Sequence, residues 1–193
     1  MEQQKSQPSK EELTRRSRRS KGKGYSFEIQ VINELKKMGY AGAKRVARSG
    51  AAHKKPYDVK VSPFRLKLEA KRRMGGSIPI EGKWLDRIAP KFAMVFAVGR
   101  RLGRGENDAI MYSISLANET HHFPEVRMSV SKTVHVRGNE FTIPRGKGLD
   151  DLVVKDKFII LYGEKKYLVQ DFHEYMSVNW EVKKNELLDG KSV

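Results

Sequence analysis

The chain has 193 residues, with 39 lysines and arginines against 23 aspartates and glutamates, so its formal net charge is 39 − 23 = +16. A charge of this size and sign favours polyanionic partners. The absence of cysteine excludes disulfide scaffolds, thiol nucleophiles and cysteine-ligated zinc sites. The length fits one domain, and no apolar stretch approaches the roughly 18 residues of a membrane-spanning helix. With no signal-peptide pattern at the start of the chain, we expect a soluble, cytoplasmic protein without a membrane partner.

Residues 1–24 predict a disordered basic arm, because they contain almost no large apolar side chain and cannot bury a core. In a chain of this charge we expect the cations of the arm to contact phosphates, while a solvated tail remains the alternative. These cations are Arg15, Arg16, Arg18, Arg19, Lys21 and Lys23.

A helix is predicted from about residue 26 to residue 38, because apolar side chains there recur every three or four positions and Gly39 follows as a stop. Ser26 is suited to cap its N-terminus. Residues 41–56 then predict a short strand and a mobile basic loop. The polar side chains of this stretch include Arg45, Arg48, Ser49, Lys54 and Lys55.

Two segments that alternate with period two, residues 58–62 and 65–72, predict a β-hairpin. Farther along the chain the hydrophobic pattern is less regular, and residues 117–151 show little pattern. The other expected elements are a helix over residues 78–90, a buried strand over 92–98, a basic glycine-rich loop over 99–105, a strand over 109–114 and a hairpin over 158–169.

The first hairpin carries the residues with the clearest chemistry. Alternation places Glu69 and Lys71 on one strand face, about 6.6 Å apart, and Asp58 on the partner strand can approach Glu69. Two carboxylates attract Mg²⁺ or Mn²⁺, and a neighbouring lysine can orient a water or stabilise developing charge, which are the parts needed for phosphodiester hydrolysis. The alternative is an ordinary charged outer face with a cross-strand ion pair.

Glu28 is unusual because it shares a helix face with the apolar residues Val31, Ile32 and Leu35. A carboxylate there is costly unless it is paired or bound to a metal. As a residue of the first helical turn, Glu28 would alternatively be a partner of the helix dipole. Together with Asp58, Glu69 and Lys71, it favours an acidic site.

The order of residues from Lys21 to Arg73 resembles the archaeal-type Holliday-junction resolvases (Hjc family) of the PD-(D/E)xK nuclease superfamily, whose members occur in archaea and phages. The matching elements are Lys21-Gly22-Lys23-Gly24, Phe27-Glu28, Gly39-Tyr40, Arg45, Arg48-Ser49-Gly50, Pro56-Tyr57-Asp58 and Leu68-Glu69-Ala70-Lys71. The chain departs from the family where Tyr57 separates Pro56 from Asp58, and where it continues some 80 residues beyond the expected core.

The resemblance implies that Asp58 and Glu69 bind the divalent metal, that Lys71 acts beside the attacking water and that Glu28 completes the acidic site. Ser49 would approach the cleaved backbone from a mobile loop. The implied activity is Mg²⁺-dependent cleavage of four-way DNA junctions, with Mn²⁺ as a substitute, by a homodimer that matches the two-fold symmetry of the junction. Further DNA contacts would come from Arg45, Arg48, Lys54, Lys55, Arg72 and Arg73.

The expected fold is α/β, with a mixed central sheet flanked by helices and a restriction-endonuclease-like nuclease core. The parts are a basic arm (1–24), a nuclease core (25–116) and a C-terminal extension (117–193) that completes or elaborates the same domain. Two alternatives stay open at this point. One is another DNA-processing or restriction-like nuclease of the same superfamily, and the other is a non-catalytic nucleic-acid-binding protein.

Overall fold

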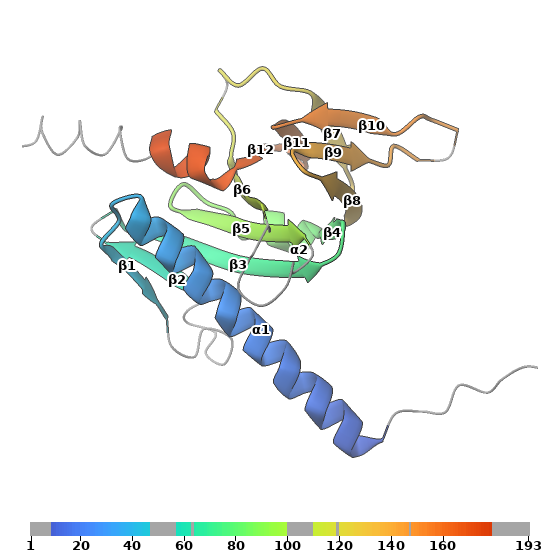
Figure 1. Ribbon diagram of the computed structural model, residues 1–193. Coiled ribbons are helices and arrows are strands. Elements are labelled where there is room, and N and C mark those ends of the chain that lie inside the picture. The colour runs from blue at the N-terminus through green and yellow to red at the C-terminus, as the bar shows by residue number, and fades with distance from the viewer. Residues whose placement is uncertain are drawn as a thin grey trace, which may run out of the picture.

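The computed structural model describes residues 9–46, 57–62, 64–99, 110–118, 120–146 and 148–178, and for residues 13, 15–21, 23, 74 and 99 it describes the backbone alone. Within these ranges the chain forms two β-sheets and a long N-terminal helix, α1 (Lys10–Lys37), as Figure 1 shows. Parallel and antiparallel strand pairs both occur, so the expected mixed α/β class is confirmed.

The larger sheet contains eight of the described strands, of which β3 and β5, and β11 and β7, pair in parallel. In spatial order they are β1 (Gly42–Arg45), β2 (Val59–Ser62), β3 (Leu66–Met74), β5 (Phe92–Gly99), β6 (Ile110–Leu116), β12 (Lys165–Asp171), β11 (Phe158–Tyr162) and β7 (Glu125–Met128). The smaller sheet is antiparallel. Its four described strands are, in spatial order, β10 (Leu152–Lys155), β9 (Glu140–Ile143), β8 (Lys132–Arg137) and β4 (Ser77–Ile80).

The C-terminal part of α1 covers one face of the larger sheet, together with a helical segment at residues 172–178 (Figure 1). Each large apolar side chain buried here contributes about 1.5–3 kcal/mol, so the contact fixes this part of α1 on the sheet. The shared core contains Phe27, Val31, Leu35, Val59, Leu68, Val95, Phe172 and Met176.

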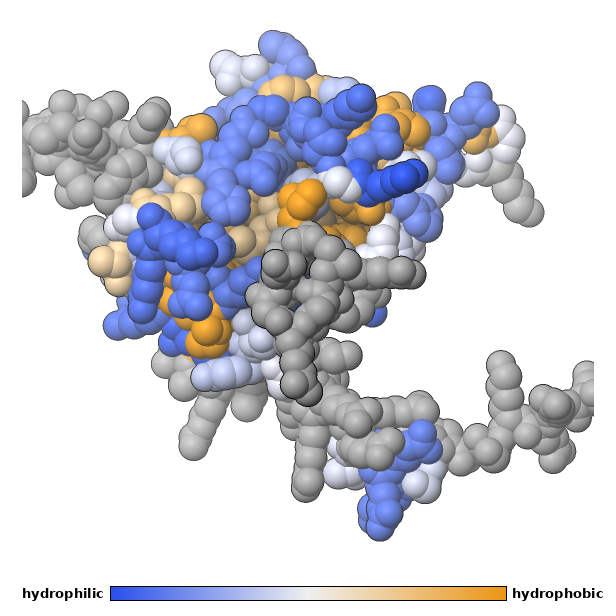
Figure 2. All heavy atoms as spheres, viewed as in Figure 1, coloured by the Kyte–Doolittle hydropathy of each residue, from blue (hydrophilic) through white to orange (hydrophobic). Residues whose placement is uncertain are grey.

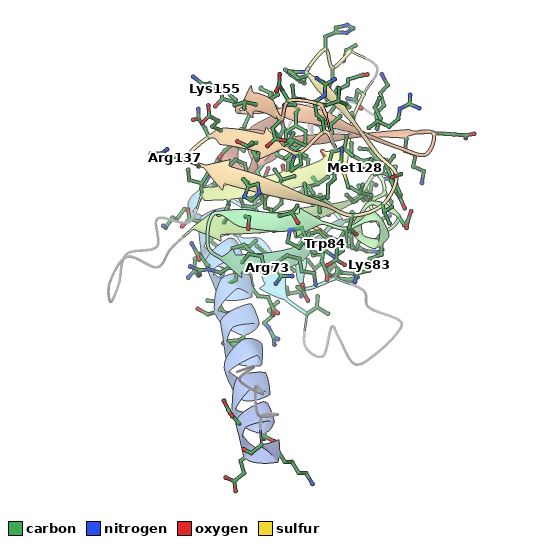
Figure 3. The ribbon with its side chains drawn as sticks, turned by 90° about the vertical axis from the view of Figure 1, so that its right-hand side faces the viewer. Arg73, Lys83, Trp84, Met128, Arg137 and Lys155 are labelled. Carbon is green, nitrogen blue, oxygen red and sulfur yellow. The ribbon has the colours of Figure 1, made fainter. Side chains whose placement is uncertain are left out.

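The smaller sheet covers the opposite face of the larger sheet over β5, β6, β12 and β11. Figure 3 shows the two sheets stacked, with Arg137 and Lys155 of the smaller sheet on the side away from α1. The core between the sheets includes Ile78, Phe96, Tyr112, Val134, Phe141, Phe158 and Tyr167. No described residue of β1, β2 or β3 belongs to this core, so the face of these three strands away from α1 lies outside it.

Helix α1 begins much earlier than the sequence predicts. We expected its start at Ser26, but it begins at Lys10, after Ser9, whose hydroxyl accepts a hydrogen bond from the backbone NH of Glu12 at 3.2 Å. Residues 10–24 are therefore helical, which corrects the predicted disordered arm, while residues 1–8 lie outside the described part of the chain. The helix ends at Lys37, close to the predicted end, and Gly39 supplies the positive φ of 93° that follows it.

The N-terminal half of α1 projects away from both sheets, as Figures 1 and 3 show from two sides. The helix has 28 residues, which corresponds to a length of about 42 Å. Its buried core residues all lie between Phe27 and Leu35. Because residues 10–24 contribute nothing to the described core, they lack the apolar periodicity that marks the docked half.

The helix expected over residues 78–90 is largely wrong. Residues Ser77–Ile80 form β4, an edge strand whose side chains Ile78 and Ile80 are buried while Ser77 and Pro79 alternate with them. Pro79 has no backbone NH to donate, which an edge strand tolerates. Only Gly82–Leu85 is helical, as the short helix α2.

The stretch 117–151, in which we expected little pattern, contains β7, β8 and β9. Each strand buries every second side chain, and Gly138, at φ 59°, forms the turn between β8 and β9. These strands belong to both sheets, so the C-terminal part of the chain shares its cores with the N-terminal part.

Other elements agree with the sequence analysis. The hairpins predicted over residues 58–72 and 158–169 are confirmed as β2–β3 and β11–β12. The buried strand is β5, the strand expected at 109–114 is β6, and the short strand within 41–56 is β1. The basic loop predicted within 47–56 and most of the loop predicted over 99–105 lie outside the described residues.

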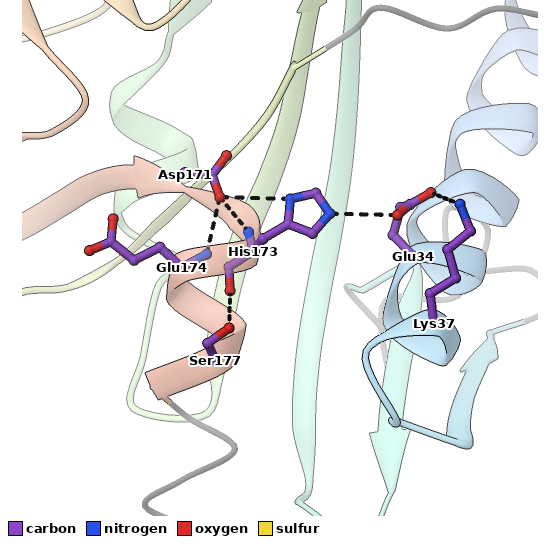
Figure 4. A network of polar contacts seen from close by, with 6 residues as sticks. All are labelled: Glu34, Lys37, Asp171, His173, Glu174 and Ser177. Carbon is purple, nitrogen blue, oxygen red and sulfur yellow. Dashed lines mark hydrogen bonds and ion pairs between the residues drawn. The ribbon is translucent and has the colours of Figure 1, made fainter.

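A polar network joins α1 to the helical segment at residues 172–178 (Figure 4). Asp171 accepts hydrogen bonds from the backbone NH groups of His173 at 2.8 Å and Glu174 at 3.0 Å, so it caps the start of this segment. His173 Nε2 lies 3.5 Å from Glu34 Oε2 on α1, and Glu34 also pairs with Lys37 at 2.8 Å. The network helps to hold the segment beside α1.

Candidate functional site

Two of the predicted acidic residues are neighbours on adjacent strands. β2 and β3 are antiparallel, with Val59 opposite Leu68. This register ends at Val59, because the Asp58 NH donates at 2.9 Å to the carbonyl of Leu68, which is already opposite Val59, so residue 58 forms a bulge. Glu69 lies on the face away from α1, because Leu68 points into the core beneath α1. The Asp58 carboxylate lies next to Glu69 along β3, because it accepts a hydrogen bond from the NH of the following residue, Ala70, at 3.0 Å.

Asp58 is held in place by backbone hydrogen bonds. Its NH donates to the Leu68 carbonyl at 2.9 Å, and its own carbonyl accepts from the Val46 NH at 2.8 Å. Its carboxylate Oδ2 accepts from the Ala70 NH at 3.0 Å. The bond to Leu68 departs from the β2–β3 register, in which Val59 is opposite Leu68, and the bond from Ala70 fixes the carboxylate against β3.

Glu69 is held by two cations. Its side chain is only 8% exposed, and Lys71 Nζ donates to Oε1 at 2.5 Å while Arg87 Nη2 donates to Oε2 at 3.0 Å. Lys71 lies two residues farther along β3 on the same face, and Arg87 follows α2 closely in the chain. A largely buried carboxylate is costly unless it is paired, so these two cations explain how the fold tolerates Glu69.

Glu28 points from α1 toward β1, where it pairs with Arg45. Burial raises the pKa of the Glu28 carboxyl and outweighs the hydrogen bond from Arg45, which lowers it; the charges of Asp58 and Glu69 raise it further. The three carboxylates therefore influence one another electrostatically. The alternative that Glu28 is a first-turn partner of the helix dipole is wrong, because α1 begins 18 residues earlier, at Lys10.

The donor set fits Mg²⁺ in its chemistry, because Asp58, Glu69 and Glu28 supply hard carboxylate oxygens. Among the residues that the structure describes, no three acidic or histidine side chains lie close enough together to hold a metal ion. Both oxygens of Glu69 are bound to cations, so Lys71 or Arg87 would have to release one of them on metal binding. The geometry thus describes a site in which Glu69 and Glu28 are paired with basic side chains and Asp58 accepts from the backbone NH of Ala70.

The raised pKa of Glu28 predicts a specific dependence of stability on pH. A carboxyl group with a raised pKa in the folded state stabilises the protein most below its ordinary value of 4.5, and this contribution is lost as the pH rises through the folded-state pKa. In Glu28→Gln the free energy of unfolding should therefore decrease less than in the wild type as the pH rises above 4.5. Urea denaturation of both proteins from acid to neutral pH measures this difference.

Glu34 provides a matched control on the same helix. The hydrogen bond from Lys37 lowers its pKa, so its contribution is present above 4.5 and is lost as the pH falls through the folded-state value. Glu34→Gln should change the pH profile in the opposite direction to Glu28→Gln. Identical changes in the two profiles would contradict the cause assigned to Glu28.

The face of β1, β2 and β3 away from α1 is strongly basic. The alternation that places Glu69 on this face also places on it Lys44, Lys60, Lys67, Lys71 and Arg73. The whole net charge is carried by the first part of the chain: residues 1–116 contain 27 basic and 11 acidic residues, 27 − 11 = +16, and residues 117–193 contain 12 of each. Figure 2 shows that hydrophilic side chains also predominate on the described surface seen from the side of α1.

The predicted DNA-contacting residues do not all lie on this basic face. Arg45 pairs with Glu28, and Arg72 donates to Gln30 of α1 at 3.4 Å, so both point toward the helix. Arg73 is exposed on the face that carries Lys71. Ser49, Arg48, Lys54 and Lys55 lie outside the described residues, and for Arg15, Arg16, Arg18, Arg19, Lys21 and Lys23 the structure gives only a helical backbone.

Sequence reasoning missed four basic residues of this surface. Arg87 fell within the helix predicted over residues 78–90, and its contact with Glu69 depends on the tertiary fold. Lys44, Lys60 and Lys67 are ordinary polar positions of strands, although their common face follows from the register of the first hairpin and of the strand before it. Strand alternation alone could have found Lys60 and Lys67.

No family model, curated protein or solved structure matches this chain. The resemblance to junction resolvases therefore rests on the sequence motifs between Lys21 and Arg73 alone. No helix among the described residues is both long enough and apolar enough to cross a membrane.

Proposed function

We propose that this protein is a divalent-metal-dependent DNA endonuclease. The observation that supports the proposal most strongly is the pair of neighbouring carboxylates: Asp58 is bound to the backbone of β3 at Ala70, next to Glu69 and its partner Lys71, within a basic surface. A polyanionic substrate is favoured by the charge of this surface, and hydrolysis is favoured by the acidic pair within it.

Each residue has a distinct part in the proposed reaction. Asp58 and Glu69 would hold Mg²⁺, for which Mn²⁺ can substitute, with Glu28 completing the acidic site. The ion, when bound, supplies a water of lowered pKa and neutralises phosphate charge. Lys71, once released from Glu69, would orient the attacking water or stabilise the charge that develops on the phosphate. Arg87 is a positioning residue, because it acts through the Glu69 carboxylate.

The proposed substrate is a four-way DNA junction, as the motifs between Lys21 and Arg73 suggest, and the nuclease core would be restriction-endonuclease-like. Resolution requires cuts on two opposed strands, so we propose a homodimer with two equivalent sites. Selectivity would come from contacts to the shape of the DNA backbone and not from base edges. The test is cleavage of a labelled mobile junction and of a linear duplex, each with and without Mg²⁺.

The outcomes of this test separate the proposed function from its nearest rival. Paired nicks in the junction that require Mg²⁺, with the duplex intact, support a resolvase. Equal or faster Mg²⁺-dependent cleavage of linear or single-stranded DNA would assign the chain to another nuclease with the same catalytic residues. In either case the acidic pair would remain the candidate site.

A non-catalytic nucleic-acid-binding protein is the second candidate. The observation that favours it is the complete pairing of the Glu69 carboxylate with Lys71 and Arg87, which is also what a structural ion-pair network looks like. Junction binding with no nicking at any concentration of Mg²⁺ or Mn²⁺ would establish this candidate and exclude the nuclease.

The projecting half of α1 leads to a prediction about the affinity for DNA. Residues 1–24 contain eight basic and three acidic residues, so deleting them removes 8 − 3 = +5 charges without removing a core residue. We expect weaker junction binding, and a log–log salt slope that falls by about 0.9 for each phosphate that the protein no longer neutralises. Anisotropy titrations at several salt concentrations measure it, and a slope equal to that of the full chain would show that this half neutralises no phosphate.

A further inference from the structure

Three lysines stand side by side across the first three strands of the larger sheet. Lys44 of β1 lies opposite Lys60 of β2, and Lys60 lies opposite Lys67 of β3. Neighbouring strands are about 4.8 Å apart, so the three positions span about 10 Å at right angles to the strands. We call these residues the lysine row.

The lysine row costs the fold stability, because like charges directly opposite each other on a sheet repel. Within the described part of the chain, no carboxylate lies within 4.0 Å of any of the three ammonium groups. The contact that Lys67 does make is with the ring of Tyr57, 5.2 Å from its centroid. A bound anion would relieve this repulsion.

The lysine row lies on a part of the sheet that the core between the two sheets does not include. No described residue of β1, β2 or β3 contributes to that core. Lys44 and Lys67 are exposed, and Lys60 is half-buried. The opposite face of the same strands is fully occupied by the packing of α1.

The lysine row is adjacent to the acidic pair. Glu69 lies two residues from Lys67 on β3, a separation of about 6.6 Å along the strand. Asp58 immediately precedes β2, two positions before Lys60, and its carboxylate accepts from the Ala70 NH of β3. The acidic pair therefore lies on one side of the lysine row, along the same strands. A chain of phosphates held by the lysines would pass beside the carboxylates.

We propose that the lysine row binds the sugar–phosphate backbone of a DNA strand and aligns it at right angles to β2 and β3, next to Asp58 and Glu69. The proposal rests on the proposed nuclease function and adds the binding surface that orients its substrate. Each lysine of the row can neutralise one phosphate, so the row contacts up to three. Lysines suit this task because they act as point charges toward phosphate without selecting a base.

The test uses the full chain carrying Lys44→Gln, Lys60→Gln and Lys67→Gln together. A control variant with Lys132→Gln, Lys155→Gln and Lys165→Gln loses the same charge from the smaller sheet and from β12. Binding of a labelled four-way junction is measured in EDTA, so that cleavage plays no part, over a range of salt concentrations. The thermal midpoint of each variant is measured without DNA.

We expect the row variant to bind more weakly and its log–log salt slope to fall by up to about 2.7, which is three neutralised phosphates at 0.9 each. The control variant should keep the slope of the wild type. The row variant should also melt at the same or a higher temperature than the wild type, because the repulsion within the row is gone. Equal slopes for the row variant and the control, with the row variant folded, would overturn the proposal.

These titrations, combined with the Mg²⁺-dependent cleavage assay, separate this proposal from the proposed function. If binding depends on the lysine row but the protein never nicks DNA with Mg²⁺, the lysine row is supported as a DNA-binding surface and the nuclease function is rejected. If the protein nicks DNA with Mg²⁺ but its salt slope is unchanged in the row variant, the nuclease function is supported and the role of the lysine row is rejected. Row-dependent binding that is tighter for duplex RNA than for any DNA probe would overturn the assignment to DNA.

Discussion

Replacing Asp58 with Asn, or Glu69 with Gln, is expected to reduce junction cleavage by on the order of 10²–10³-fold or more, the scale of losing one preorganised group that stabilises charge. Each change keeps the shape of the side chain and removes the negative charge that would hold Mg²⁺. Junction binding in EDTA should be retained, because it depends on lysines and arginines. The measurement is the single-turnover rate of nicking with excess enzyme.

Matched controls for these variants are available on the same chain. Asp151→Asn and Glu164→Gln make the same chemical changes at exposed positions and should leave the nicking rate unchanged. Lys71 and Arg87, the partners of Glu69, are 37% and 36% exposed, so water can solvate them in Glu69→Gln and the fold should persist. Nicking at the wild-type rate by either site variant would remove the acidic pair from the reaction.

The site was predictable where local rules decide it. Alternation along residues 65–72 fixed Glu69 and Lys71 on one face, and the short hairpin brought Asp58 close to Glu69, with its carboxylate bound to the Ala70 NH. The Glu69–Arg87 contact was not predictable, because Arg87 reaches the site only after β4 and α2 have turned the chain back toward β3. The partner of Glu28 depends in the same way on the position of β1 beneath α1.

The early start of α1 could have been predicted from a capping signal, although the apolar pattern begins only later in the helix. Ser9 and Glu12 have the spacing of a capping box, and Lys, Arg, Glu and Leu, which dominate the next residues, are good helix formers. Apolar periodicity begins only at Phe27 because only the docked half has a core to face. Periodicity therefore indicates where a helix packs and not where it begins.

The smaller sheet was missed for a different reason. Its strands β8, β9 and β10 have two buried positions each at most, too few to stand out from the polar residues around them. The Gly138-Asn139 pair between β8 and β9 is a two-residue hairpin signal. Pairing of β8 with β4, more than 50 residues earlier in the chain, is set by tertiary packing that no local pattern contains.

The second large effect that we predict is on stability and concerns Phe141, the aromatic residue that joins the two sheets. Its ring lies 4.7 Å from that of Tyr112 and 5.1 Å from that of Phe158, both on the larger sheet. Phe141→Ala should lower the free energy of unfolding by about 3–5 kcal/mol. For a chain of this length that corresponds to a fall in thermal midpoint of about 6–20 °C.

The control for Phe141→Ala is Val153→Ala on the neighbouring strand β10. Val153 is 53% exposed, on the side of the smaller sheet away from the core, so its loss should change stability by no more than about 0.5 kcal/mol. Unfolding is followed by far-ultraviolet circular dichroism and by the fluorescence of Trp84, which lies in the core between the sheets, in a Trp180→Phe background. Two separate transitions would show that the smaller sheet folds independently of the larger one.

Phe141→Ala also tests how far the basic surface depends on the smaller sheet. The lysine row and the acidic pair lie on β1, β2 and β3, whose core is the one beneath α1, whereas Phe141 belongs only to the core between the sheets. Below its melting temperature the variant should therefore bind the junction with the salt slope of the wild type. A reduced slope in the folded variant would mean that the smaller sheet positions the basic surface, and that the two cores are coupled through β5 and β6, which contribute to both.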